Sequence, residues 1–397
     1  MIRSAQSIAL KRLISLRSGS STDSQSGNGN IPVMGATGII GTTSQSNCDV
    51  GSSLIGRVGT VGQVNYVTQS CWAADNVIVA TPKGIDSRYA YFLLSGIHLP
   101  GLASSTAQPL LTAAAIGSVR VDVPTLEEQR RIAAFLDAEI SRWDELARVR
   151  TGHWAALDEY EMASIADTLS GSATMSNGRP TGWQWLPVVP ADWRIGPVYA
   201  YFEAQLGKML NSDRAAGFDQ APYLRNANVH WYQLDCSDMA TMSFPPEERY
   251  RYRVEPGDLL VCEGGAGVAE AAVWDGRVEP CYFQKSLHRV RRNADVPVEW
   301  LMYWLRLAKY CGVFEADGNV ATIPHLTGEQ LRRYRIPIPP DGERRVARLS
   351  REVEQLSELR GRIAQADALT AERKQALIVA AVTGQFDVTT GRGADLS

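Results

Sequence analysis

One stretch of the sequence decides the fold: residues 124–171, PTLEEQRRIAAFLDAEISRWDELARVRTGHWAALDEYEMASIADTLSG. Thr125 followed by Glu128 is the capping-box pattern of a helix N-terminus. Apolar residues then recur at helical spacing with no intervening proline: Ile132, Leu136, Ile140, Trp143, Leu146, Leu157, Tyr160, Ile165 and Leu169. The pattern predicts a helix of about 45 residues, roughly 65 Å long. A helix of this length needs a packing partner.

A second stretch repeats the first. Residues 339–345, PPDGERR, mirror residues 124–130, PTLEEQR, and the apolar spacing that follows is the same. We expect these side chains to form the contact between two long helices, or with a partner protein: Leu136, Ile140, Trp143, Leu146, Leu349, Val353, Leu356 and Leu359. Two long helices, each preceded by a block of mixed composition, indicate an internal duplication.

The blocks between the helices have an α+β character. In the first block, short strand-like pieces separated by glycines accompany predicted helices at residues 8–16 and 88–94. The expected organisation is a first domain at residues 1–122, a central long helix at 123–171, a linker at 172–183, a second domain at 184–338, a distal long helix at 339–384 and a tail at 385–397.

Composition excludes several classes of protein. The net charge of −3 and the pI of about 6.0 give no bulk-charge argument for nucleic-acid binding, although local basic patches would suffice. The six cysteines include no C-x-x-C pair, and the five histidines are dispersed, so no metal site is predicted. The longest apolar run, residues 376–382, is too short to span a membrane. We therefore expect a reduced, cytoplasmic protein without a membrane partner.

Four stretches lie in and around the two long helices: residues 121–132 (VDVPTLEEQRRI), 222–229 (PYLRNANV), 257–265 (GDLLVCEGG) and 369–388. In this order they resemble the specificity (S) subunit of type I restriction–modification systems. The similarity extends from residue 31 to residue 388. The duplicated arrangement around two long helices is its most specific feature.

The resemblance implies two α/β-type target-recognition domains, each reading one half of a bipartite site in double-stranded DNA. It also implies that the long helices pair antiparallel as a coiled-coil spacer and dock two methyltransferase (M) subunits. Family members carry no active site. S-adenosylmethionine, ATP and magnesium are accordingly expected on the M subunits and on the restriction and translocation (R) subunits, and no cofactor is expected on this chain.

The sequence departs from the family pattern at two places. Residues 267–270 read GVAE where the family often has Gly-Arg, and the Glu270 carboxylate there would repel phosphate. The start of the second long helix, residues 341–344 (DGER), lacks the usual leucine and glutamine.

No motif predicts catalysis by this chain. An adenine methyltransferase needs an Asn/Asp-Pro-Pro-aromatic loop, which is absent, and residues 264–267 (GGAG) do not complete a cofactor fingerprint. Asp258 and Glu263 have nuclease-like separation, but no lysine follows within two residues. Residues 59–62 (GTVG) lack the ending of a phosphate loop, which favours turn glycines.

Polar and basic residues on loops are the candidates for DNA contact. In the first domain they are Arg57, Gln63, Ser105 and Gln108, and in the second they are Lys208, Arg225, Asn226, Asn228, Gln284, Lys285 and His325. Lysine and arginine suit phosphate or guanine, and asparagine and glutamine suit adenine. For each residue the alternative is ordinary surface polarity or a bond that stabilises a turn.

The leading hypothesis is thus a non-catalytic DNA-specificity subunit. One alternative is a coiled-coil interaction protein without DNA specificity. The other is a DNA methyltransferase or nuclease in its own right.

Overall fold

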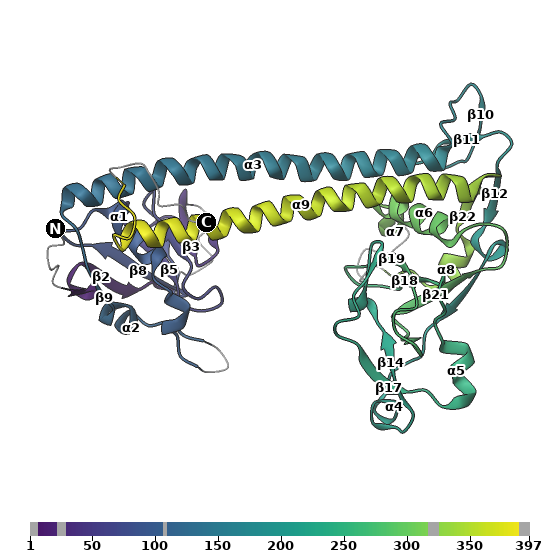
Figure 1. Cartoon of the computed structure of the whole chain (residues 1–397), viewed down its shortest axis with the longest axis horizontal. Helices are drawn as coiled ribbons and strands as arrows, with labels where there is room; N and C mark the ends of the chain where they lie inside the picture. The colour runs from purple at the N-terminus through teal and green to yellow at the C-terminus, as the bar shows by residue number, and fades with distance from the viewer. Residues whose placement is uncertain (1–6, 22–28, 106–108, 317–324, 389–397) are drawn as a thin grey trace. The chain divides into compact units, whose positions relative to one another are not determined.

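The computed structural model describes residues 7–21, 29–105, 109–316 and 325–388 (Figure 1). The chain divides into two compact units. Unit 1 comprises Met1–Gly152 with Arg362–Ser397, and unit 2 comprises His153–Gly361. Among the described residues, no helix is both long enough and apolar enough to cross a membrane.

The two predicted long helices are present. Helix α3 spans Leu126–Ser170 and helix α9 spans Gly342–Val382. The capping box at the start of α3 forms as expected, because Thr125 N donates to Glu128 Oε2 at 2.9 Å and Glu128 N donates to Thr125 Oγ1 at 3.4 Å. Gly171, with φ of 62°, ends the helix in the left-handed conformation that glycine tolerates.

Within each unit, the segments of α3 and α9 pair antiparallel. Polar bonds join α3 residues of rising number to α9 residues of falling number. They are Asp144 with Lys374 (2.9 Å) and Arg150 with Asp367 (2.5 Å) in unit 1, and Asp158 with Arg360 (2.6 Å) and Thr168 with Arg348 (3.2 Å) in unit 2. The antiparallel pairing implied by the family resemblance is therefore confirmed.

The predicted apolar contacts are mostly, but not all, buried. Those that are buried are Leu136, Ile140, Leu349, Val353 and Leu356, and Trp143 is half-buried. Leu146, which is 53% exposed, and Leu359, which is 44% exposed, are not buried in the helix pair, so contact with a partner protein stays the prediction for them. Each lies ten residues after a buried leucine, and ten residues at 3.6 per turn rotate a side chain about 80° from the buried stripe.

Unit 1 contains two main sheets. The first has the order β2-β8-β5-β6 (Ile14–Ser18, Val77–Pro82, Ser53–Gly56, Val64–Tyr66), with all neighbours antiparallel. The second has the order β4-β3-β7 (Gly38–Thr43, Ile31–Gly35, Trp72–Ala73), in which β7 is parallel to β3. Strands β1 (Ile8–Ala9) and β9 (Arg120–Val121) form a separate pair.

The helices of unit 1 close its core. They are α1 (Ser87–Gly96) and α2 (Ala113–Ser118), with short 3-10 turns η1 (Leu10–Arg12) and η2 (Leu99–Leu102). Helix α1 lies in one apolar cluster with Leu136 and Ile140 of α3 and Ile378 and Val382 of α9. The helix predicted at residues 8–16 is wrong, since β1, η1 and β2 occupy that segment.

Unit 2 repeats these two sheets. Their orders are β13-β21-β18-β19 (Phe202–Leu206, Leu287–Arg292, Leu259–Cys262, Ala271–Val273) and β17-β14-β20 (Ala240–Ser243, Gln220–Leu224, Tyr282–Phe283). In the described part of unit 2, three two-stranded pairs accompany them: β12–β22 (Arg194–Pro197, Arg335–Ile338), β10–β11 (Gly178–Pro180, Val188–Pro190) and β15–β16 (Val229–His230, Gln233–Leu234). The segment expected as a linker, residues 172–183, thus contributes strand β10.

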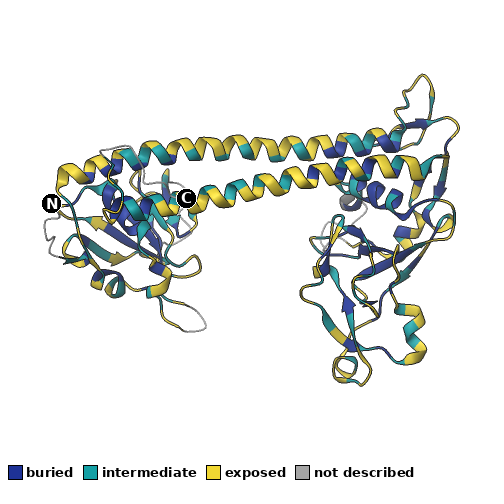
Figure 2. Cartoon of the chain, in the orientation of Figure 1, coloured by how far each residue is buried: buried dark blue, intermediate teal, exposed yellow. Residues whose placement is uncertain are grey.

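Helix α6 (Val298–Tyr310) is the buried helix in the core of unit 2. The other described helices of this unit are α4 (Ser212–Ala216), α5 (Pro246–Tyr252), α7 (Val313–Ala316) and α8 (Gly328–Arg333), with turns η3 (Val198–Ala200) and η4 (Asn226–Asn228). Trp300 and Trp304 of α6 are buried beside Leu349 and Val353 of α9. Figure 2 shows the buried residues gathered on the inner strands and on α6.

The duplication extends to individual backbone bonds. In unit 1, Arg57 follows β5. Its backbone O accepts a hydrogen bond from Leu111 N (3.1 Å), and its backbone N donates one to Asn76 O (3.0 Å). In unit 2, Glu263 follows β18. Its backbone O accepts a hydrogen bond from Leu326 N (2.6 Å), and its backbone N donates one to Ser286 O (2.8 Å). Arg57 and Glu263 therefore occupy equivalent positions in the two repeats.

The helix seam predicts a sharp contrast between two leucines of α9. Leu349→Ala should lower the free energy of unfolding by about 2–5 kcal/mol, because a fully buried side chain is lost and a cavity remains. Leu359→Ala should change it by less than about 0.5 kcal/mol, because Leu359 is exposed. Urea denaturation followed by circular dichroism measures both, and equal losses would contradict the assigned seam.

Candidate nucleic-acid interface

Loops at one end of the unit 2 sheets converge around Asn226. Its backbone N donates to Ser286 Oγ (3.2 Å), and its side-chain Nδ2 donates to Gly264 O (2.8 Å). Ser286 Oγ in turn donates to Gln284 Oε1 (2.9 Å). One asparagine thus ties together the ends of β14 and β18 and the turn between β20 and β21.

A fourth segment joins this group from the chain before α8. Leu326 N bonds to Glu263 O, and His325 forms a bridge with Gly264. A β-carbon placed on Gly264 would lie 2.5 Å from His325 Nδ1, so only glycine allows this approach. The structure therefore gathers five of the predicted residues, which together with Gly264 we call the unit 2 loop cluster: Arg225, Asn226, Gln284, Lys285 and His325.

The members of the cluster differ in how far they reach the surface. Lys285 and His325 are exposed, whereas Arg225, Asn226 and Gln284 are half-buried. Arg225 is paired with Asp238 at 2.7 Å. Two cations, an imidazole and two amides lie in this cluster. Such groups offer donors to phosphates, and both donors and acceptors to base edges.

The expectation that Lys208 lies on an exposed loop is wrong. Its side chain is 1% exposed. Its ammonium group donates to Ser243 O at 2.7 Å, pairs with Glu248 and lies 4.9 Å from the centre of the Phe244 ring. A buried lysine must be paired, and this one holds β17 and α5 in place.

The same correction applies to Asn228, which is 2% exposed. Its Oδ1 accepts from Arg225 N (3.0 Å), and its Nδ2 donates to the backbone oxygens of Asp235 (2.8 Å) and Asp238 (3.0 Å). The side chain thus shapes the loop that presents Arg225 and Asn226. This is the turn-stabilising role left open for asparagine by the sequence.

In unit 1, three of the four predicted residues, Arg57, Gln63 and Ser105, are described, and they lie around the loop that follows β5. Arg57 is half-buried, and Gln63 is exposed while its backbone O accepts from Gly56 N at 2.8 Å. Ser105 is exposed, in the segment that Leu111 ties to Arg57. Gln108 lies outside the described residues. Gly59 and Gly62 have φ of 72° and 83°, as turn glycines do.

Two of the acidic residues that raised other possibilities, Asp258 and Glu270, are in ion pairs. Asp258 is 2% exposed and accepts two bonds from Arg291, at 2.6 and 2.7 Å. These bonds raise the pKa of Arg291 above its ordinary value. Glu270 pairs with Lys309 at 3.5 Å, so its charge is partly neutralised. Among the described residues, no cluster of three or more His, Cys, Asp or Glu side chains could hold a metal ion.

His288 supports the cluster and was not identified from the sequence. It is 1% exposed, and its Nε2 lies 2.7 Å from Leu326 O, in the loop that carries His325. Burial lowers the pKa of His288 below the ordinary 6.5. The neutral ring can donate this bond. In the sequence His288 stands in a basic strand, LHRVRR, where nothing distinguishes it from the neighbouring arginines.

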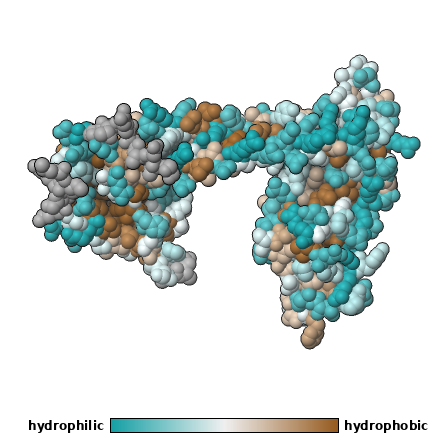
Figure 3. All heavy atoms as spheres, in the orientation of Figure 1, coloured by the Kyte–Doolittle hydropathy of each residue, from teal (hydrophilic) through white to brown (hydrophobic). Residues whose placement is uncertain are grey.

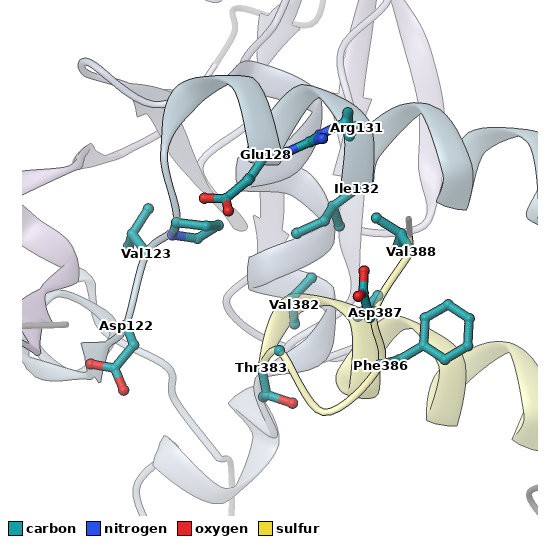
Figure 4. A pocket seen from close by; sticks show the side chains of 13 residues that line it. Asp122, Val123, Glu128, Arg131, Ile132, Val382, Thr383, Phe386, Asp387 and Val388 are labelled. Atoms are coloured by element: carbon teal, nitrogen blue, oxygen red, sulfur yellow. The ribbon is translucent and has the colours of Figure 1, made fainter. Parts of the chain in front are cut away.

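A second feature of unit 1 is a groove where α3 begins and α9 ends (Figure 4). It has a volume of about 540 Å³. Ile132 of α3 and Val382 of α9 line it, together with Phe386, whose ring stacks on Phe135 with centroids 5.4 Å apart. Glu128 and Arg131 lie at its edge.

Comparisons with known proteins agree with the resemblance found in the sequence. Residues 8–148 match the family described as the type I restriction modification DNA specificity domain. The specificity subunit of the Type I restriction enzyme EcoprrI of Escherichia coli is 33% identical over 108 residues, which span 27% of this chain and 27% of that protein. A Haemophilus influenzae protein named as a type I restriction enzyme specificity subunit is 22% identical over 323 residues, covering 79% of this chain and 77% of its own.

A solved structure shares the fold. It comes from work titled as the structural basis of complex assembly and conformational transition of the type I R-M system. It matches with a TM-score of 0.69 and 18% identity, over 96% of this chain and 98% of the other. The resemblance to type I specificity subunits is confirmed. The relatives do not favour the alternatives of an interaction protein or an enzyme.

The buried state of His288 predicts a pH dependence for the stability of unit 2. Because its pKa is lowered on folding, the unfolded chain takes up the proton first, and stability falls as pH drops below about 6.5. In His288→Gln, which keeps a donor for Leu326 O but does not titrate, this loss should be smaller. Urea midpoints at pH 7.5 and 5.5 measure it.

The matched control is His153→Gln, on the exposed surface of α3. It should keep the full loss of stability between the two pH values. If His288→Gln also kept the full loss, the buried imidazole would not be its source.

Proposed function

We propose that this chain is the DNA-specificity subunit of a type I restriction–modification complex, in which each unit reads one half of a bipartite site in double-stranded DNA. The observation that carries the proposal is the repeat itself. The same pair of sheets occurs twice, and each copy packs on its own segment of α3 and α9. A duplicated reader on a shared frame suits a target made of two separated half-sites.

In unit 2, the reading surface is the loop cluster. Lys285 and His325 are exposed there and are available to phosphates or to acceptor groups on base edges. Asn226 and Gln284 hold the loops through their amides, and the Asn226 Oδ1 is buried. Base readout is a property of such side chains on loops held by a rigid scaffold.

The two units present different chemistry at the same place. Arg57 in unit 1 and Glu263 in unit 2 follow equivalent strands and are both half-buried. A guanidinium suits the acceptor groups of guanine, and a carboxylate suits the amino group of cytosine. The proposal therefore assigns different half-sites to the two units.

The long helices would set the spacer between the half-sites and dock two M subunits. Support for docking comes from apolar side chains that the helix pair leaves exposed: Leu146, Val149, Tyr160, Leu359 and Leu369. Figure 3 shows apolar surface of this kind along the helices. The groove beside Ile132 and Val382 offers a further apolar contact in unit 1.

The chain would leave the chemistry to its partners. Methyl transfer from S-adenosylmethionine would occur on the M subunits, and ATP- and magnesium-dependent translocation and cleavage on the R subunits. The absence of an Asn/Asp-Pro-Pro-aromatic loop from the sequence and the names of the relatives support this division.

The test is to map N6-methyladenine by long-read sequencing in cells that express the M partner with and without this chain. The proposal predicts methylation at one bipartite motif, present only when the chain is present. Lys285→Ala should reduce methylation, because a phosphate or base contact is lost. Lys11→Ala, at an exposed lysine of unit 1 that is not among the predicted DNA contacts, should not.

Methylation of the same motif without the chain would overturn the proposal. So would methylation by the purified chain alone, because the chain would then carry its own active site.

A further inference from the structure

Two buried cysteines of unit 1 stand opposite each other. Cys48 and Cys71 form an antiparallel backbone pair, and each N donates to the other's O at 3.0 Å. Their exposed fractions are 2% and 1%. Residues paired in this way have α-carbons about 5.5 Å apart, within the range of about 4.4–6.8 Å that a disulfide spans.

The thiols of Cys48 and Cys71 share a hydrogen bond. A hydrogen bond from Cys71 lowers the pKa of Cys48 to about 7, with help from Ser52 and the positive charge of Arg17 and against the effect of burial. The same interaction raises the pKa of Cys71. One thiolate beside one retained thiol is the asymmetry needed for an attacking and a resolving cysteine.

A small oxidant can approach the pair from the side of Cys71. Cys71 lines a cavity of about 120 Å³, whose other walls include Tyr66 and the exposed residues Ile39, Thr68 and Gln69. A water molecule takes about 30 Å³ of liquid, so the cavity has room for a peroxide.

The second repeat provides an internal comparison. There Val254 N donates to Cys281 O (2.9 Å), so Val254 stands in place of Cys48 and Cys281 in place of Cys71. Burial raises the pKa of Cys281 to about 12. The repeat thus keeps one buried cysteine with a valine opposite it, and the dithiol belongs to unit 1.

We propose that Cys48 and Cys71 form a reversible oxidation site, at which a hydroperoxide oxidises the two thiols to a disulfide. The Cys48 thiolate attacks a peroxide oxygen and the O–O bond breaks, which gives a Cys48 sulfenic acid and, with hydrogen peroxide, a hydroxide that takes a proton to become water. The Cys71 sulfur then attacks the Cys48 sulfur and displaces the second water. Two thiols are oxidised and one peroxide is reduced to two waters.

The disulfide would restrict the motion of the segment that carries Arg57, because it would link the two ends of that segment. The bond would close the chain between residues 48 and 71, which includes β5, β6 and the loop after β5. At a hydrogen-bonded strand pair the β-carbons must approach each other slightly for the bond to form, and strained disulfides of this kind are readily reduced.

The test is to treat the full chain with hydrogen peroxide, denature it, alkylate the free thiols and analyse the peptides by mass spectrometry. The expected product is a Cys48–Cys71 cross-linked peptide that dithiothreitol reverses, with a rate that falls as pH drops through about 7. Cys281 should remain alkylated. In Cys48→Ser the cross-link should be absent, and in Cys281→Ser it should persist.

A gain-of-function variant keeps the proposal testable if Cys48→Ser does not fold. Val254→Cys places a second thiol opposite Cys281 and should allow a cross-link in unit 2. If both Cys48 and Cys71 stay alkylated in the wild-type chain under peroxide that oxidises the exposed Cys311, the proposal fails. It also fails if Cys48 is over-oxidised without ever linking to Cys71.

Discussion

The apolar stripes of α3 and α9, buried against each other and against the core of each unit, are the contact on which the rest of the structure depends. Helices of this length are unstable alone in water. In unit 1 the pair supplies Leu136 and Ile378 to the core, and in unit 2 it supplies Leu169 and Leu349. The helices are therefore walls of both cores, and each sheet pair folds against a surface that the helices provide.

Buried charges fix unit 2 on its helix segment more specifically than apolar contact does. Glu161 of α3 is 1% exposed and accepts from Tyr232 OH (2.8 Å) and Arg306 Nε (3.2 Å), and it pairs with Arg360 of α9 (2.7 Å). The burial and the nearby carboxylate raise the pKa of Tyr232. Removing one partner would leave an unpaired buried charge, so the sheet region cannot slide along the helices without cost.

Much of this organisation could be predicted from periodicity and local chemistry. The apolar spacing and the Thr125–Glu128 capping box placed the long helices within a few residues, because these signals are local. The face of the helix on which each side chain lies was harder to predict. The spacing alone did not show that Leu146 and Leu359 lie outside the buried stripe of the helix pair. The helix expected at residues 8–16 failed because strand pairing of β1 with β9 and of β2 with β8 overrides a weak local pattern.

The candidate site shows where sequence stops being informative. Residue type suggested Lys208 and Asn228 as DNA contacts. Lys208 is buried through partners far along the chain, such as Glu248, and Asn228 through the loop that ends at Asp238. The equivalence of Arg57 with Glu263 and the pairing of Cys48 with Cys71 also depend on strand register. Charge and spacing in the sequence could not reveal either relation.

The most direct measurement is the methylation motif produced when residues 184–338 are exchanged for those of a relative with a different target. If two readers share one helical frame, one half of the motif should change, and the other half and the spacer length should stay the same. A change in both halves, or in the spacer, would contradict the account.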